Sequence, residues 1–152
     1  MYIKQHKHLS YLVQLENYLI PDEYIDLVKG KNLGHLATKN SDGTLQISPV
    51  WVDYNDISGN LMINSAIGRR KVKNMKITAP VAISIVDSDN PGRYLSIEGV
   101  VDEHIIDGAE EHLHKLNKRY TSTDTFEIAS SKQRIIIVIK PIKILTGNYK
   151  KI

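Results

Sequence analysis

The sequence predicts an α+β domain, mainly β, in which six or seven antiparallel strands form a barrel-like sheet accompanied by two or three helices. Three observations predict this fold class. From residue 33 onward, apolar and polar residues alternate with a period of two along most segments. Turn-forming residues separate these segments at short intervals, which favours neighbouring antiparallel strands. Fewer segments have the spacing or the boundary residues of helices.

The first predicted element is a short helix over residues 20–30. Pro21 falls in its first turn and acidic residues follow, while Lys29 and Gly30 close the segment. Upstream, residues 1–19 are expected to form an N-terminal arm that contributes packing or dimer surface.

A meander of three antiparallel strands is predicted next. Pro49 lies inside the second strand and cannot donate a ladder hydrogen bond, which indicates a sheet edge or a bulge where backbone groups are free to meet a ligand. The turns between the strands are rich in Asn, Asp, Ser and Gly, which favours hairpins. The strands are residues 33–38, 45–54 and 61–65, and the turns are residues 40–43 and 55–60.

Two further helices are predicted in the second half of the chain. The first covers residues 68–78 and ends before Pro80, because proline disfavours a helical residue in front of it. The second covers residues 107–120, with Asp107 as its expected N-cap and an apolar stripe on one face. The stripe consists of Ala109, Leu113 and Leu116.

The remaining segments of the second half are predicted to be strands. Gly99 lies within one of them, where it indicates a bend or a bulge. Pro141 lies between the last two segments, which are expected to form one or two β segments. The strands are residues 81–86, 93–104, 133–140 and 142–145.

Composition excludes several classes of protein. The chain has 152 residues, 41% of them apolar and 24% charged, as expected for one globular domain over residues 1–152. It has no cysteine, which excludes disulfides, thiolate zinc sites and a cysteine nucleophile. Its longest apolar run has five residues, whereas a membrane helix needs about 20. Since the chain also starts without the apolar region of a signal peptide, we expect a soluble cytoplasmic protein with no membrane partner.

A basic segment is the most informative chemical feature of the sequence. Residues 68–76 contain five cations and no carboxylate, at the start of a predicted helix whose dipole favours anions there. The cations also repel one another at helical spacing. A bound phosphate would compensate, because free backbone N–H groups and cationic side chains both bind it. The alternative is a basic face that is simply exposed to solvent.

Helical spacing distinguishes the cations of this segment. Arg69 and Lys71 flank the predicted buried stripe, which favours them as ligand contacts, whereas Arg70 points away. Asn64 and Ser65 come just before the segment and are either polar groups near the helix start or donors to the same phosphate.

Other catalytic and metal chemistries have little support. His112 and His114 are two residues apart on a predicted helix and therefore face different directions, unlike a metal-binding pair. We expect no metal. The serines on predicted strands lack a Gly-x-Ser-x-Gly elbow, so no serine nucleophile is predicted. Trp51, the only tryptophan, is interpreted as a packing residue of the core or of a dimer.

Several motifs in a fixed order resemble those of a known family. The similar family is the pyridoxamine 5′-phosphate oxidase-like superfamily of split-barrel flavin-binding proteins, and the likeness extends from about residue 33 to residue 101. The motifs are Leu36-Ala-Thr, Asp42-Gly, Ser48-Pro-Val-Trp, Asn64-Ser, Gly68-Arg-Arg-Lys-Val-Lys-Asn-Met, Pro80-Val and Glu98-Gly.

The resemblance implies a six-stranded antiparallel split β-barrel that forms a homodimer, with FMN or, alternatively, coenzyme F420 in the groove between protomers. It implies that Arg69 and Lys71 hold the cofactor phosphate, with Arg70 sharing this role. It further implies that the strand edge lining the site carries Ser48, Val50, Asn64 and Ser65.

The resemblance also implies an activity. The expected function is a flavin- or deazaflavin-dependent oxidoreductase that transfers hydride to or from a small organic substrate, with no catalytic residue supplied by the protein. The alternative is a carrier or sensor that binds the cofactor without turnover. The chain lacks the Arg-x-His pattern that the oxidase uses near its C-terminus, so oxidation of pyridoxamine phosphate is not expected.

A nucleic-acid-binding barrel is the third hypothesis. It is suggested by the basic segment and by eight tyrosines. However, the net charge is only +3, and scattered tyrosines with a single phenylalanine do not make a stacking platform. We therefore expect no nucleic-acid partner.

Overall fold

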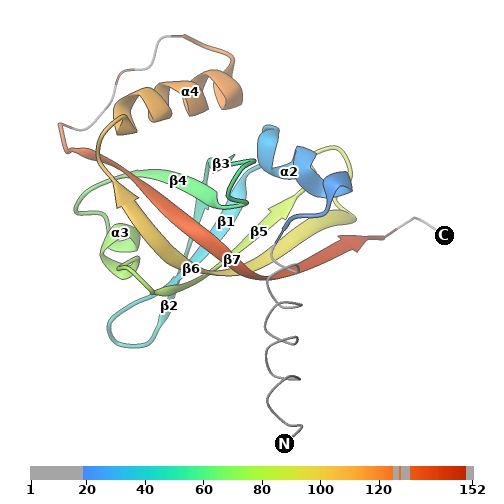
Figure 1. Cartoon of the computed structure of the whole chain (residues 1–152), viewed down its shortest axis with the longest axis horizontal. Helices are drawn as coiled ribbons and strands as arrows, with labels where there is room; N and C mark the ends of the chain where they lie inside the picture. The colour runs from blue at the N-terminus through green and yellow to red at the C-terminus, as the bar shows by residue number, and fades with distance from the viewer. Residues whose placement is uncertain (1–18, 125–126, 128–130, 150–152) are drawn as a thin grey trace, which may run out of the picture.

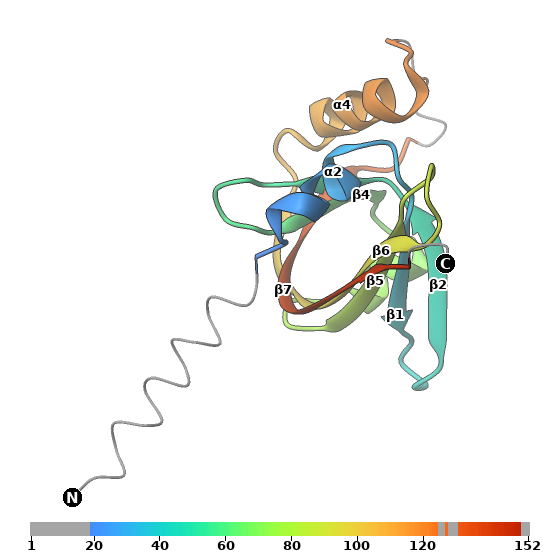
Figure 2. The ribbon, with the colours of Figure 1, turned by 90° about the vertical axis from the view of Figure 1, so that its right-hand side faces the viewer.

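The computed structural model describes residues 19–124, 127 and 131–149. The N-terminal arm expected over residues 1–19 therefore lies almost entirely outside the described residues. The described chain forms one antiparallel sheet of seven strands in the order β2-β1-β5-β6-β7-β4-β3, which curls into a split barrel (Figures 1 and 2). The strands are β1 (Gly34–Lys39), β2 (Leu45–Val50), β3 (Val52–Tyr54), β4 (Leu61–Ala66), β5 (Pro80–Val86), β6 (Arg93–Ile105) and β7 (Arg134–Asn148).

The helices are short except for the last. Figure 1 shows α4 lying across one end of the barrel, beyond β4 and β7, with α2 beside it. Within the described residues, no helix is long and apolar enough to span a membrane. The helices are η1 (Asp22–Tyr24), α2 (Ile25–Lys29), α3 (Arg70–Asn74) and α4 (Ala109–Thr121).

The barrel interior holds the main apolar core. Alternate residues of each strand face inward, as the period of two requires. The run of residues 135–139 is buried on both faces, because β7 lies between the barrel interior and α4. Ile137 belongs to the interior core, whereas Ile136 and Val138 pack with Ala109 under α4. This double burial explains why β7 is the most apolar segment of the chain.

The predicted strand over residues 45–54 is divided at Trp51. Up to Val50 the chain pairs with β1, and from Val52 it pairs with β4, so β2 and β3 form opposite edges of the sheet. Trp51 is thus the corner at which the chain passes from one edge to the other. This division gives seven strands rather than six. The edge position indicated by Pro49 is confirmed, since β2 has one neighbour only.

The last strand is continuous through Pro141, so the one or two β segments expected over residues 133–145 are a single strand. The pairing of β6 with β7 shifts register between Glu98 and Gly99, opposite Pro141, so a bulge accommodates the proline without ending the strand. A Cβ at position 99 would lie 2.7 Å from Ile139 Cγ2 and 2.9 Å from the Lys140 carbonyl oxygen, which explains the glycine there. The bend predicted at Gly99 is confirmed.

Two helix predictions are wrong at their ends. The basic segment forms a helix of five residues, not one over residues 68–78. It starts late because Gly68 has a φ of +95° and Arg69 is extended, and it ends early because the backbone of Met75, with a ψ of 57°, is not helical. The N-cap of α4 is Gly108, with a φ of +76° and no side-chain capping bond, so Asp107 does not cap it. The predicted apolar stripe of α4 is confirmed, since its three residues are buried.

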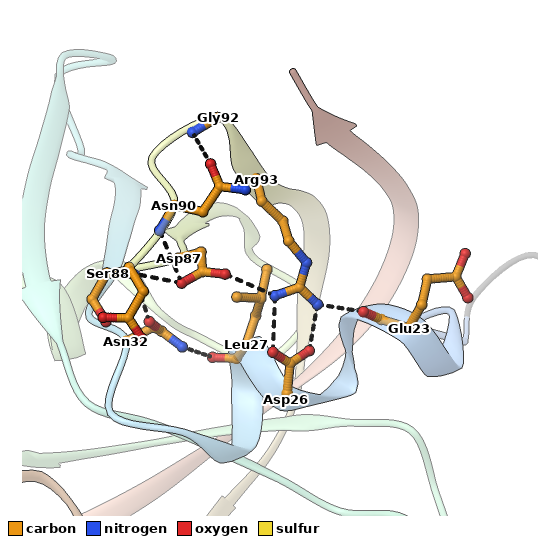
Figure 3. Close-up of polar contacts among 10 residues, drawn as sticks. Glu23, Asp26, Leu27, Asn32, Asp87, Ser88, Asn90, Gly92 and Arg93 are labelled. Carbon is orange, nitrogen blue, oxygen red and sulfur yellow. Dashed lines mark hydrogen bonds and ion pairs between the residues drawn. The ribbon is translucent and has the colours of Figure 1, made fainter. Parts of the chain in front are cut away.

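Arg93 connects α2 to the β5–β6 turn (Figure 3). Its guanidinium donates to Asp26 Oδ2 at 2.8 Å and to Asp87 Oδ2 at 2.9 Å, and it also donates to the Glu23 carbonyl. The guanidinium carbon lies 5.1 Å from the centre of the Tyr24 ring. Arg93 lowers the pKa of the Asp26 carboxyl through these hydrogen bonds. The arrangement fixes α2 against the end of the barrel away from α3.

We expect Arg93→Ala to lower the free energy of unfolding by about 2 kcal/mol, measured by urea denaturation. The ion pairs with Asp26 and Asp87, the hydrogen bond to the Glu23 carbonyl and the contact with Tyr24 are lost. Because Asp26 is exposed, the loss of stability is smaller than the sum of these contributions. Lys29→Ala is the control, because it removes an exposed ion pair with Asp56, which contributes about 0.5 kcal/mol or less. Equal losses in the two variants would contradict a structural role for Arg93.

Candidate functional site

An open pocket of about 370 Å³ lies at the corner formed by Trp51, between β4, α4 and the start of α3. Its lining combines apolar walls with three cations and one amide, and it contains no carboxylate, histidine or hydroxyl group. The apolar residues are Leu33, Pro49, Val50, Trp51, Leu113 and Leu116, and the polar ones are Asn64, Arg69, Lys71 and Arg134.

The three cations of the pocket lack counter-charges. Among the described residues, no carboxylate forms an ion pair with any of them. Burial, followed by the charges of Arg69 and Arg134, lowers the pKa of Lys71. Burial and the charge of Arg69 likewise lower the pKa of Arg134. Since the cations disfavour one another, an anion in the pocket would stabilise all three.

Trp51 forms a flat aromatic wall of the pocket. Its ring stacks on Tyr120 of α4, with the centroids 5.3 Å apart and the planes 10° apart. The Tyr120 hydroxyl donates to the Asn32 carbonyl at 2.9 Å and accepts from the Val52 N–H at 3.0 Å. Because these bonds fix Tyr120, they also fix the ring of Trp51. The packing role predicted for Trp51 therefore coincides with a place in the pocket wall.

Four of the residues expected at the site share this pocket. They come from β2, β4 and the α3 segment, which the topology brings to one corner. They are Val50, Asn64, Arg69 and Lys71.

The other three expected site residues lie elsewhere. Arg70 lines a second hollow of about 880 Å³ on the other side of α3, with Lys73 and the 40–44 turn. Ser48 is half-buried on β2 and is not part of the pocket lining. Ser65 is 1% exposed within the barrel, and its Oγ has no hydrogen-bond partner in the described part of the chain. Alternation along β4 puts Ser65 on the face opposite to Asn64.

A buried carboxylate, not identified from the sequence, anchors α4 beside the pocket. Asp53 of β3 is 2% exposed and accepts hydrogen bonds from three side chains of α4. The distances are 2.7 Å to Lys115 Nζ, 2.7 Å to Arg119 Nη2 and 3.2 Å to His112 Nε2. Burial alone would raise the pKa of Asp53, but these hydrogen bonds outweigh it and hold the pKa well below its usual range.

The spacing of three residues in the sequence could have indicated this cluster around Asp53. His112, Lys115 and Arg119 follow one another at three and four residues, so a helix presents them on one face. Asp53 is the charged residue between the hydrophobic residues Val52 and Tyr54 of a strand that is buried throughout. Nothing in the sequence, however, indicates that β3 and α4 are neighbours.

Arg134 is the other site residue that was not identified from the sequence. It precedes the apolar run of β7, and its Nε and Nη2 donate to Asn64 Oδ1 at 2.9 and 2.6 Å. Asn64 Nδ2 donates in turn to the Ala109 carbonyl at 2.7 Å and lies 3.1 Å from His112 Nδ1. The pocket is thus connected to α4 by hydrogen bonds.

Comparison with known proteins agrees with the fold and with the ordered motifs. The family model described as pyridoxamine 5′-phosphate oxidase matches residues 20–146. A solved structure named F420 reductase is 34% identical, with a TM-score of 0.74, and the alignment covers 83% of this chain and 98% of that chain. No curated protein matches the chain.

More distant solved structures share the fold. A conserved hypothetical protein from Mycobacterium tuberculosis is 20% identical, with a TM-score of 0.64 over 90% of this chain and 94% of that chain. HupZ from Group A Streptococcus is 18% identical, with a TM-score of 0.62 over 87% of this chain and 100% of that chain. Together with the family model, which matches most of the sequence, these findings show that the chain belongs to the pyridoxamine 5′-phosphate oxidase-like family of split barrels.

Proposed function

We propose that this chain is a flavin- or deazaflavin-dependent oxidoreductase whose pocket holds the phosphate of FMN or of coenzyme F420. The observation that carries the proposal is the group of three cations without a carboxylate, beside an aromatic wall. A phosphate supplies the missing negative charge, and a tricyclic ring suits the apolar walls. The pocket volume, about 370 Å³, lies within the range of small-molecule sites.

The family relationship supports both cofactors, and one relative favours F420. FMN and F420 each combine a planar ring system with a phosphate, so the same donor set suits either. The relative at 34% identity is named an F420 reductase, which makes F420 the first ligand to test.

The protein's own contribution would be binding and orientation. When bound, the ring would supply the hydride chemistry. Arg69, Lys71 and Arg134 would hold the phosphate, while Trp51 and Leu116 would orient the ring and exclude water. The pocket has no carboxylate or histidine among its described lining residues, and hydride transfer needs no acid or base from the protein.

A homodimer is part of the proposal. Leu45 and Ile47 of the edge strand β2 are 72% and 69% exposed, and Ile47 lies beside Ala37 in the register. This apolar strip continues into Pro49, which lines the open pocket. A second copy of the chain on this face would cover the strip, and the open pocket would then lie in the groove between the two protomers. Light scattering during size-exclusion chromatography measures the expected mass of two chains.

Titration of the purified protein with F420 and with FMN tests the cofactor assignment. We expect saturable binding of at least one of them, detected by absorbance or by quenching of the fluorescence of Trp51, the only tryptophan. Binding of neither cofactor would contradict the proposal.

A carrier or sensor is the second candidate function, because a pocket whose described lining has no carboxylate or histidine serves binding without turnover equally well. Steady-state oxidation of the reduced cofactor by a quinone or an enone separates the two functions. Multiple turnovers indicate the oxidoreductase. Stoichiometric binding with no turnover of any acceptor indicates the carrier or sensor.

A further inference from the structure

The amide of Asn64 is fully used within the protein. Its two N–H groups meet the Ala109 carbonyl at 2.7 Å and His112 Nδ1 at 3.1 Å, and its oxygen accepts two hydrogen bonds from Arg134. A side-chain amide has two hydrogens and one oxygen with two lone pairs, so no further partner can be added without breaking one of these bonds. Asn64 therefore acts on a ligand through Arg134.

The hydrogen bonds of the Asn64 amide are compatible with only one orientation of its oxygen and nitrogen. Turning it over would point its oxygen at the Ala109 carbonyl and its NH₂ group at the guanidinium of Arg134, both of which are repulsive. Of its partners, only His112 connects Asn64 to a further buried side chain, the carboxylate of Asp53.

His112 fits this position in one tautomer. Asp53 is ionised because its pKa is held well below the usual range, so His112 Nε2 carries the hydrogen and donates to it. His112 Nδ1 faces an N–H of Asn64 and accepts from it through its lone pair. At 9% exposure, the imidazole has little access to water as a substitute partner.

We propose that His112 is a positioning residue for the pocket: through Asn64, it holds the guanidinium of Arg134 where the cofactor phosphate binds. The four side chains form one line from the buried Asp53 carboxylate on β3, across α4, to β4 and β7. Within the described residues, Asn64 takes two of the five N–H donors of Arg134, which leaves both hydrogens of Nη1 and the second hydrogen of Nη2 to donate to an anion. The ligand part of this inference rests on the proposed function, whereas the arrangement of the side chains does not.

The test compares His112→Leu with His112→Gln. Glutamine retains an acceptor for Asn64 and a donor for Asp53, whereas leucine has neither. For whichever of FMN and F420 the wild type binds, we expect His112→Leu to lower the affinity about fivefold to tenfold and His112→Gln to stay within twofold. His114→Leu, on the exposed face of α4, is the matched control and should leave the affinity unchanged. Wild-type affinity in His112→Leu, or an equal loss in His112→Gln, would overturn the proposal.

A measurement without cofactor keeps the inference separate from the proposed function. In ¹H–¹⁵N spectra of the ligand-free wild type, we expect a slowly exchanging Arg134 Nε–H, identified by its absence in Arg134→Lys. The signal should persist in His112→Gln and be lost in His112→Leu. Histidine ¹⁵N spectra of the wild type should show His112 with its hydrogen on Nε2, a result that needs no variant. The other tautomer, or an unchanged Arg134 signal in His112→Leu, would overturn the inference even if neither cofactor binds.

Discussion

Replacing Arg69 and Lys71 together with alanine is expected to weaken the binding of F420 or FMN at least 100-fold. Each side chain would make a charge-assisted hydrogen bond to the phosphate, and each such bond contributes about 1.5–3 kcal/mol. Losing both costs about 3 kcal/mol or more, which corresponds to about two powers of ten in Kd. Titration by fluorescence measures the change. The fold should persist, since neither side chain takes part in the core or in an ion pair among the described residues.

The matched control is the double variant Lys73→Ala/Lys76→Ala. It removes the same net charge from the same basic segment, but from side chains that line the second hollow. We expect its affinity to stay within about threefold of the wild type, because screened charges act weakly beyond about 10 Å. If both double variants weaken binding equally, the cations act as a diffuse field and the assignment of the phosphate to this pocket is wrong.

Asp53→Asn is expected to lower the free energy of unfolding by about 3 kcal/mol at neutral pH. The amide has nearly the shape of the carboxylate but leaves the cations of α4 without their shared negative charge. The energetic cost is largest at Arg119, because its side chain is only 20% exposed and water cannot replace the lost carboxylate. The more exposed Lys115 recovers part of its hydration. For a chain of this length, the loss corresponds to a fall in Tm of about 6–12 °C. Thermal and urea unfolding measure it.

The difference in the free energy of unfolding between the wild type and Asp53→Asn depends on pH with a definite sign. The folded pKa of Asp53 lies below its ordinary value of 3.8, so its contribution to stability is fully present above pH 3.8 and is lost as the pH falls toward the folded value. The difference in the free energy of unfolding between the wild type and Asp53→Asn should therefore become smaller below about pH 4. Asp56→Asn, at an exposed ion pair, should change stability little at any pH. A difference that stays constant down to pH 2 would contradict the role of the ionised carboxylate.

Local patterns predicted most of the barrel because they depend on neighbours in the sequence. Alternation located the strands, turn residues located the hairpins, and Gly99 marked its bulge. The error in strand number occurred where a longer-range contact decided the outcome, because the two sides of Trp51 pair with different edges of the sheet. A register shift opposite Gly99, with Ile142 as the extra residue of β7, lets one strand continue through Pro141.

Helix ends were the least predictable local feature. The basic segment has the spacing of a longer helix, yet the extended backbone of Arg69 and the non-helical backbone of Met75 confine α3 to five residues. A helix this short has a weak dipole, so the case for an anion rests on the side chains of Arg69, Lys71 and Arg134. Arg70 lines the second hollow, away from Arg69 and Lys71, as helical spacing had indicated.

The sequence by itself determined the family, the curled antiparallel sheet and two cations of the pocket, because motif order, periodicity and helical spacing are local properties. Tertiary structure alone decided that Arg134, 70 residues after Asn64, reaches the same pocket, and that Asp53 meets a helix about 60 residues further along. The physical reason is that alternation tells which residues share a face, while strand order determines which faces meet. Pairing of β4 with β7, and docking of α4 on a buried carboxylate, bring these side chains together.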